Sequence, residues 1–176
     1  MKDFLYTPYE LAIIIHNNHL ENQQYIKLLN ALHTYDNSFI QPKYRNDAKA
    51  FILDVMDKIV YISYPDAYGS EQTDCEKDSE QFGIVAKKER QEDYQENNMY
   101  FKELRIRIKY INSNRFVKKK FGILLSDLGY ERRSSKLVRY INNCLYFYHI
   151  EATLKGNIPC NIDKVDHNDT VVFRTL

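Results

Sequence analysis

The fold is decided by the stretch 124–136, which reads LLSDLGYERRSSK. Apolar residues recur at helical spacing up to this point, and they predict a helix from Arg115 to Leu128. Gly129 is suited to the left-handed conformation that commonly ends a helix. A second apolar stripe predicts another helix from Ser134 to Phe147, with Leu137, Val138, Ile141 and Leu145 facing inward. The sequence therefore predicts two short helices joined by a tight glycine turn.

A strand–turn–strand pattern follows these helices. Ile150, Ala152 and Leu154 alternate with more polar residues, 155–157 has the composition of a turn, and 171–173 is a short apolar run. Two helices and a hairpin in this order predict a winged helix-turn-helix. The second helix of a helix-turn-helix fits the major groove of DNA.

The N-terminal half is predicted to be helical. Thr7-Pro8-Tyr9-Glu10 has the pattern of a capping box and opens a helix that runs to about residue 18 and buries Leu11, Ile14 and Ile15. A second helix, 22–33, has Ile26, Leu29 and Leu32 on one side, and 39–44 is a connector. Asp47 caps a third helix, whose apolar residues recur from Ala48 to Val60.

These elements give a mainly α protein with a small β component, an α+β fold. We expect a helical unit at 1–64, an acidic connector at 65–100 and a winged helix-turn-helix domain at 101–176. Residues 103–110 alternate apolar and basic side chains but also fit a helical stripe. We interpret them as a strand because Ile106 would face water on a helix, and we expect Arg105, Arg107 and Lys109 to lie off the apolar face.

Charge is distributed unevenly along the chain. The formal net charge is only +1, yet residues 101–140 carry 12 basic and 3 acidic side chains, whereas residues 66–100 carry 4 and 10. Local charge density decides whether phosphate is attracted, because exposed charges further apart than about 8–10 Å are largely screened. The C-terminal half is thus one basic module. We expect the acidic stretch to be attracted to this basic module, within the chain or across a dimer. Residues 66–96 then either mask the basic face or form a solvated tether.

The double arginine at 132–133 stands where the second helix begins. Arginine presents a planar fork of donors that can pair with guanine or with phosphate, and the free amides of a helix start can also bind phosphate. Surface salt bridges and a protein-binding face are the competing interpretations of these residues. The predicted nucleic-acid-binding residues are Arg132, Arg133, Ser134, Ser135, Lys136, Arg139, Tyr140, Asn143, Lys118, Lys119, Lys120 and Lys155.

No catalytic, metal or cofactor site is predicted. His16 and His19 have helical spacing but no third ligand, and Asp54 and Asp57 are interpreted as exposed charge on a helix. The three cysteines have no CxxC spacing, and Cys144 is interpreted as a small buried apolar residue. Phosphate-binding loops and nucleophile elbows are also missing from the sequence.

No apolar run is long enough to span a membrane, and the N-terminus lacks a signal-peptide pattern. We therefore expect a cytoplasmic protein with no membrane partner.

A resemblance to a known module is carried by the run 124–133, followed by Leu137-Val138, Ile141 and Leu145, and ending with 169–173. These residues resemble a winged-helix-like module found in bacterial restriction and phage-defence proteins. The resemblance covers about 50 residues, and the loop from Lys155 to Val165 is longer than this module has. It implies a DNA-binding role in such a system.

The function predicted from the sequence is that of a non-enzymatic double-stranded DNA-binding protein. Its expected setting is that of an accessory, specificity or regulatory subunit of a bacterial or phage defence system, with a protein partner or a second copy of the chain. One alternative is an adaptor whose basic face docks on an acidic protein. The other is a small nuclease whose site the sequence does not reveal.

Overall fold

The structure is a computed structural model that describes residues 4–63 and 91–176. The chain divides into two units, 1–78 and 79–176. The predicted acidic connector, 65–100, lies mostly outside the described residues. Its predicted end at residue 100 falls inside helix α5 (Gln91–Ile106), so the C-terminal unit begins earlier than the sequence pattern indicates.

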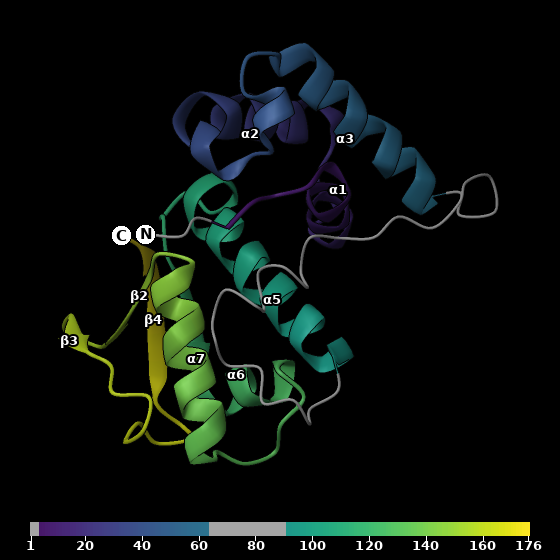
Figure 1. Cartoon of the computed structure of the whole chain (residues 1–176). Coiled ribbons are helices and arrows are strands. Elements are labelled where there is room, and N and C mark those ends of the chain that lie inside the picture. Colours follow the sequence, from purple (N-terminus) through teal and green to yellow (C-terminus); the bar gives the residue numbers. More distant parts are fainter. Residues whose placement is uncertain (1–3, 64–90) are drawn as a thin grey trace. The chain divides into compact units, whose positions relative to one another are not determined.

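In unit 1, residues 4–63 form three α-helices (purple to blue in Figure 1): α1 (Pro8–Asn17), α2 (Asn22–Tyr35) and α3 (Ala48–Ser63). Two 3-10 turns, η1 (Asn37–Phe39) and η2 (Pro42–Tyr44), connect α2 to α3, which packs on both other helices. The predicted capping box is confirmed: the Glu10 amide donates to Thr7 Oγ1 at 3.1 Å, and the Thr7 amide donates to Glu10 Oε2 at 2.9 Å. Asp47 also caps α3, because its Oδ1 accepts from the Ala50 amide at 2.9 Å.

The core of unit 1 agrees with the predicted helix faces except on α2. Leu29 and Leu32 are buried as expected, but Ile26 is exposed, and Tyr25 and Leu28 are buried instead. The buried face of α2 is therefore rotated about the helix axis relative to the predicted face. On α3 only Phe51 and Val55 are fully buried.

Unit 2 begins with α5 and a π-helical turn, η4 (Arg107–Ile111), followed by strand β1 (Val117–Lys120). Helices α6 (Phe121–Asp127) and α7 (Ser135–Phe147) come next, and then β2 (Ile150–Leu154), β3 (Ile158–Pro159) and β4 (Thr170–Thr175). The four strands form an antiparallel sheet in the order β1-β4-β2-β3. Figure 1 shows α5, α6 and α7 on one side of the sheet.

The predicted strand at 103–110 is wrong, because this segment is the end of α5 and the turn η4. The strand was preferred in order to keep Ile106 out of water, but Ile106 is 0% exposed on the helix. Arg105 is also buried, at 3% exposed, contrary to its expected place off the apolar face. The end of α5 is enclosed on several sides, and a one-sided apolar stripe does not describe such a helix.

The predicted helix from Arg115 to Leu128 is correct only from Phe121 onward. Residues 117–120 form β1 and pair with β4, with Val117 opposite Phe173 and Lys120 opposite Thr170. This pairing supplies the backbone hydrogen bonds that a helix would otherwise have made, and distant partners of this kind commonly override local helix propensity.

The predicted glycine turn, second helix and pair of strands are confirmed, whereas β3 is an additional strand that the sequence pattern does not predict. Gly129 ends α6 with φ +81°, and Ser134 caps α7 by accepting from the Leu137 amide at 3.2 Å. Strands β2 and β4 are the predicted pair, and 155–157 is a turn. The protein is thus mainly α with a small antiparallel sheet. In the described ranges, no helix is both long and apolar enough to cross a bilayer.

Candidate nucleic-acid interface

Helix α7 has one buried side and one exposed side. Leu137, Val138, Ile141 and Leu145 are all buried, as predicted, with Ile141 at 0% exposed. Leu125 of α6 is buried as well. Burial of these residues fixes the rotation of α7 about its axis, and therefore fixes which residues it presents to solvent.

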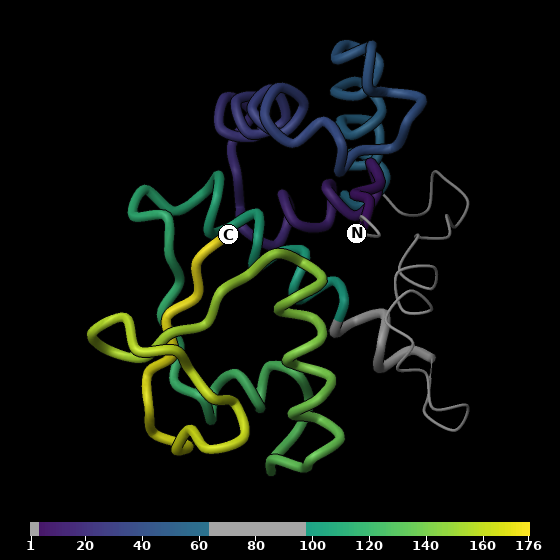
Figure 2. The backbone as a smooth tube through the Cα atoms, turned by 60° about the vertical axis from the view of Figure 1, so that its left-hand side comes forward, coloured from purple at the N-terminus to yellow at the C-terminus, as the bar shows by residue number. Residues whose placement is uncertain are grey.

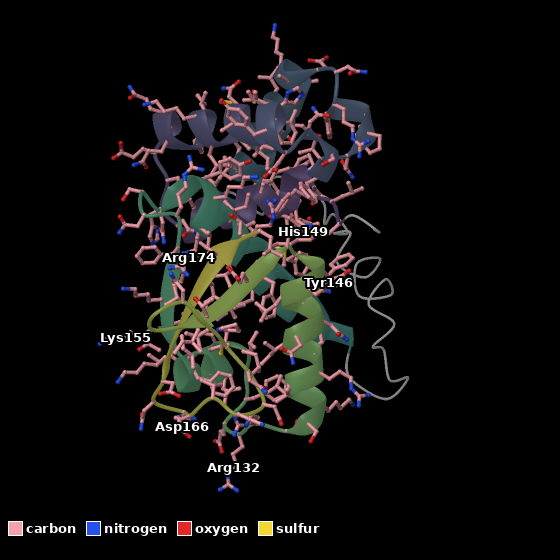
Figure 3. The ribbon with its side chains drawn as sticks, turned by 90° about the vertical axis from the view of Figure 1, so that its left-hand side faces the viewer. Arg132, Tyr146, His149, Lys155, Asp166 and Arg174 are labelled. Carbon is pink, nitrogen blue, oxygen red and sulfur yellow. The ribbon has the colours of Figure 1, made fainter. Side chains whose placement is uncertain are left out.

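The exposed side of α7 carries Lys136, Arg139, Asn142 and Tyr146, and Asn143 is half-buried beside them. Their spacing of three or four residues places them along one stripe. Arg139 has no hydrogen bond or ion pair within the described part of the chain. Tyr146 lies at the far end of the stripe and is 70% exposed (Figure 3). The predicted nucleic-acid-binding residues do not include Asn142 and Tyr146, although helical spacing from Arg139 leads to both.

Tyr140 was predicted to lie on this outer face, and this is wrong. It is 4% exposed, and its hydroxyl donates to Asn98 Oδ1 of α5 at 3.4 Å. Tyr140 therefore belongs to the packing between α7 and α5, and is removed from the candidate interface.

The two neighbouring arginines at the start of α7 have different surroundings. Arg132 projects into solvent (Figure 3) and makes no hydrogen bond or ion pair among the residues that the structure describes. Arg133 Nη1 instead donates to the carbonyl of Val165 at 2.7 Å and to that of Ile162 at 3.3 Å. Its guanidinium also lies 5.7 Å from the centre of the Phe121 ring. Arg133 is thus held within the domain, whereas Arg132 is available for contact.

The connection from Lys155 to Asp169, called the wing loop below, folds back onto α6 and the turn between α6 and α7 (Figure 2). Two backbone amides at the start of α6 are satisfied by it: Phe121 donates to the Asp169 carbonyl at 2.9 Å, and Gly122 donates to the His167 carbonyl at 2.8 Å. Ile162 and Val165 bury their side chains, at 1% and 4% exposed. The wing loop is therefore bound, through main-chain oxygens, to the start of α6 and to Arg133 in the turn between α6 and α7.

The wing loop also brings negative charge to the start of α7. Asp166 and Arg132 both line a cavity of about 200 Å³ between the loop and the turn. Asp163, Asp166 and Asp169 outnumber the two lysines of the loop. Phosphate is attracted less strongly at this end of α7 than its own sequence indicates.

The predicted lysines lie apart from the stripe on α7. Lys118 and Lys120 are exposed on β1, and Lys155 is at the tip of the β2–β3 turn, far from Arg132 in Figure 3. Lys119 points the other way and pairs with Asp127 of α6, with its ammonium 5.1 Å from the centre of the Tyr100 ring. Lys119 is therefore occupied, and the predicted binding residues are divided between two surfaces.

The environment of Lys119 shifts two pKa values. Burial alone would lower the pKa of Lys119, but its hydrogen bond to Asp127 and its contact with Tyr100 outweigh burial, so that the pKa is raised. Burial raises the pKa of Tyr100. Both groups stay protonated near neutral pH.

The remaining polar candidates have structural surroundings. Asp54 accepts from the Tyr44 hydroxyl and lies 3.9 Å from Lys58, while Asp57 is exposed. His16 and His19 are exposed, and no group of three metal-ligating side chains occurs in the described ranges. Cys144 is fully buried, as predicted, and burial raises the pKa of its thiol.

The predicted masking of the basic face by residues 66–96 falls outside the residues whose side chains are described.

Comparison with protein-family models, with curated proteins and with solved structures gives no significant match.

Proposed function

We propose that the C-terminal unit is a winged helix-turn-helix that binds double-stranded DNA, with α7 as the helix that enters the major groove. The observation that carries this proposal is the exposed stripe of α7, in which Lys136, Arg139, Asn142 and Tyr146 lie outward while the opposite side is buried. Major-groove edges are read by arginine at guanine and by asparagine at adenine.

The charge pattern supports the same proposal. No acidic residue occurs between Arg132 and Ile150, and four cationic residues fall in that span. Ser134 is the N-cap of α7, so Arg132 and Arg133 directly precede the positive end of the helix dipole in the chain. Positive charge at a helix start favours phosphate.

In this proposal, Arg139 and the asparagines contact bases, while Lys136 and Arg132 contact phosphates on either side. Arg133 takes no part in DNA contact, because its guanidinium is engaged with the wing loop. A role as an accessory or regulatory subunit of a bacterial defence system stays a prediction from the resemblance.

The test is duplex affinity measured by fluorescence anisotropy across a salt series. Arg139→Ala should weaken binding by about 1–3 kcal/mol, roughly 5- to 150-fold, if Arg139 contacts a base. Arg132→Ala should lower the slope of log affinity against log salt by about one, because one phosphate contact is lost.

Lys27→Ala is the matched control, since Lys27 is an exposed cation on α2 in unit 1 and its loss changes the net charge equally. It should leave both affinity and salt slope within error. Equal affinities for the wild type and the folded Arg139→Ala protein would refute the role of α7.

A protein-binding role is favoured by one observation: Asp166 of the wing loop lines the same cavity as Arg132, so the start of α7 presents both signs of charge. An adaptor of this kind would show no duplex binding at low salt, which the same titration detects.

A further inference from the structure

The sheet of unit 2 has an outward face, opposite the helices, that carries a second group of cations. Along β1 the side chains alternate: Val117 is buried and Lys119 reaches Asp127 of α6, so these two point toward the helices. Lys118 and Lys120 therefore point away from the helices, and both are exposed. Same-side residues on a strand lie about 6.6–6.8 Å apart along the backbone, so both lysines extend from the same stretch of this face.

Arg174 of β4 and Lys118 of β1 both lie against the aromatic ring of Phe116. The Lys118 ammonium is 5.1 Å from the centre of that ring, and the Arg174 guanidinium is 5.8 Å from it. Arg174 Nη1 also donates to Thr153 Oγ1 of β2 at 3.0 Å. The aromatic ring and the threonine thus hold two cations in place on the sheet.

The charge of this face, defined by Phe116, Lys118, Lys120 and Arg174, is positive. Glu151 is opposite Arg174 in the β2–β4 register and is the acidic residue nearest to it on the sheet. Lys118 and Lys120 make no ion pair with any described residue. Two cations therefore remain after Glu151 is counted against Arg174.

We propose that this face is a second binding surface for the phosphate backbone of DNA, separate from α7. It lies on the side of the sheet that the helices leave open, whereas α7 lies on the covered side (Figure 1). One domain would then hold two duplex segments, one on each side of the sheet. The inference takes DNA as the ligand from the proposed function.

The chemistry of the face favours phosphate over an acidic protein. A guanidinium offers a fork of donors that fits phosphate oxygens, and part of the Arg174 fork is already oriented by Thr153. Protein interfaces centre on a buried apolar patch. Here the aromatic ring is already covered by two cations, and Val172 and Thr153 beneath them are buried.

Lysines on an outer strand also keep that strand from pairing with another sheet, and β1 is an edge of this sheet. The double variant Lys118→Glu, Lys120→Glu keeps the edge charged and so preserves this protection. The variant changes the charge of these two positions from positive to negative, and phosphate binding requires the positive charge. It therefore tests phosphate binding without exposing the strand edge.

The experiment mixes the full chain with donor- and acceptor-labelled duplexes of about one helical turn, roughly 10 base pairs. The wild type should bind two duplexes per chain and produce energy transfer between them. The Lys118→Glu, Lys120→Glu protein should bind one duplex with the affinity of the α7 site and lose the energy transfer. Arg139→Ala should weaken the α7 site and leave binding at the sheet face.

Binding of one duplex per chain by the wild type would overturn the second site. Equal weakening of all duplex binding by the sheet variant would show that the lysines belong to the α7 site, and this also overturns the proposal. Binding of polyglutamate but not of duplex at this face would assign it to an acidic protein instead. Failure of the proposed function is distinct, because then Arg139→Ala changes nothing.

Discussion

The substitution Arg133→Ala should loosen the attachment of the wing loop to α6 and to the turn between α6 and α7. The substitution removes the 2.7 Å and 3.3 Å bonds to the carbonyls of Val165 and Ile162, and the contact with the Phe121 ring. A hydrogen bond from a charged donor contributes about 1.5–3 kcal/mol, and an exposed cation–π contact about 0.5–1 kcal/mol. Because Arg133 is itself exposed, water can replace part of this, and we expect a loss of about 2 kcal/mol.

Amide hydrogen exchange measures this loss locally, which matters because a chain of two units need not unfold in one step. The reporters are the amides of Phe121 and Gly122, which donate to carbonyls of the wing loop. Their exchange should accelerate by roughly 10- to 30-fold, since about 1.4 kcal/mol corresponds to a factor of ten.

Arg132→Ala is the matched control, because Arg132 is the adjacent arginine and has no partner in the described part of the chain. It should leave the exchange of both amides unchanged. If Arg133→Ala also leaves both exchange rates unchanged, then Arg133 does not hold the wing loop in place.

Three further outcomes are expected. Ile141→Ala should lower the free energy of unfolding by about 2–5 kcal/mol, because Ile141 is 0% exposed. Gly122→Ala should destabilise the unit, since a Cβ at Gly122 would collide with the ring of His167, and adding His167→Ala should restore stability. The stability contributed by Lys119 should be present below the ordinary lysine pKa of 10.5 and lost as the pH rises through the raised pKa of Lys119, and Asp127→Asn should reduce this alkaline dependence.

Each outcome has a measurement that would contradict it. Asn142→Ala, on the exposed side of α7, is the control for Ile141 in chemical denaturation, and equal losses would refute the assigned rotation of the helix. A double mutant no more stable than Gly122→Ala would show that His167 is not the obstacle. An identical alkaline transition with and without Asp127 would remove the ion pair as its cause.

Features set by neighbouring residues could be predicted from the sequence. The capping box at Thr7, the left-handed Gly129 and the N-cap at Ser134 all depend on residues within a few positions. The buried side of α7 also follows from spacing alone. These features account for α6, the glycine turn, α7 and its exposed stripe.

Features set by distant partners could not be predicted. Strand β1 exists because residues 117–120 pair with β4, 50 to 56 positions later in the chain. Ile106 is buried by elements that its own spacing does not reveal. The partners of Arg133 lie 29 and 32 residues away. The sequence therefore shows two adjacent arginines, whereas in the structure Arg132 is available for contact and Arg133 holds the wing loop. Tyr140 was misplaced for the same reason, because its partner is on α5.

The attachment of the wing loop has a consequence for how the domain tolerates change. The loop is held by hydrogen bonds to the backbone carbonyls of Ile162, Val165, His167 and Asp169, and every amino acid supplies a backbone carbonyl. The exposed side chains between them, Asp163, Lys164 and Asp166, can therefore be exchanged without releasing the loop. A library of variants at these three positions would change the charge beside α7 while the fold stays the same. New binding preferences can therefore arise there without loss of folding.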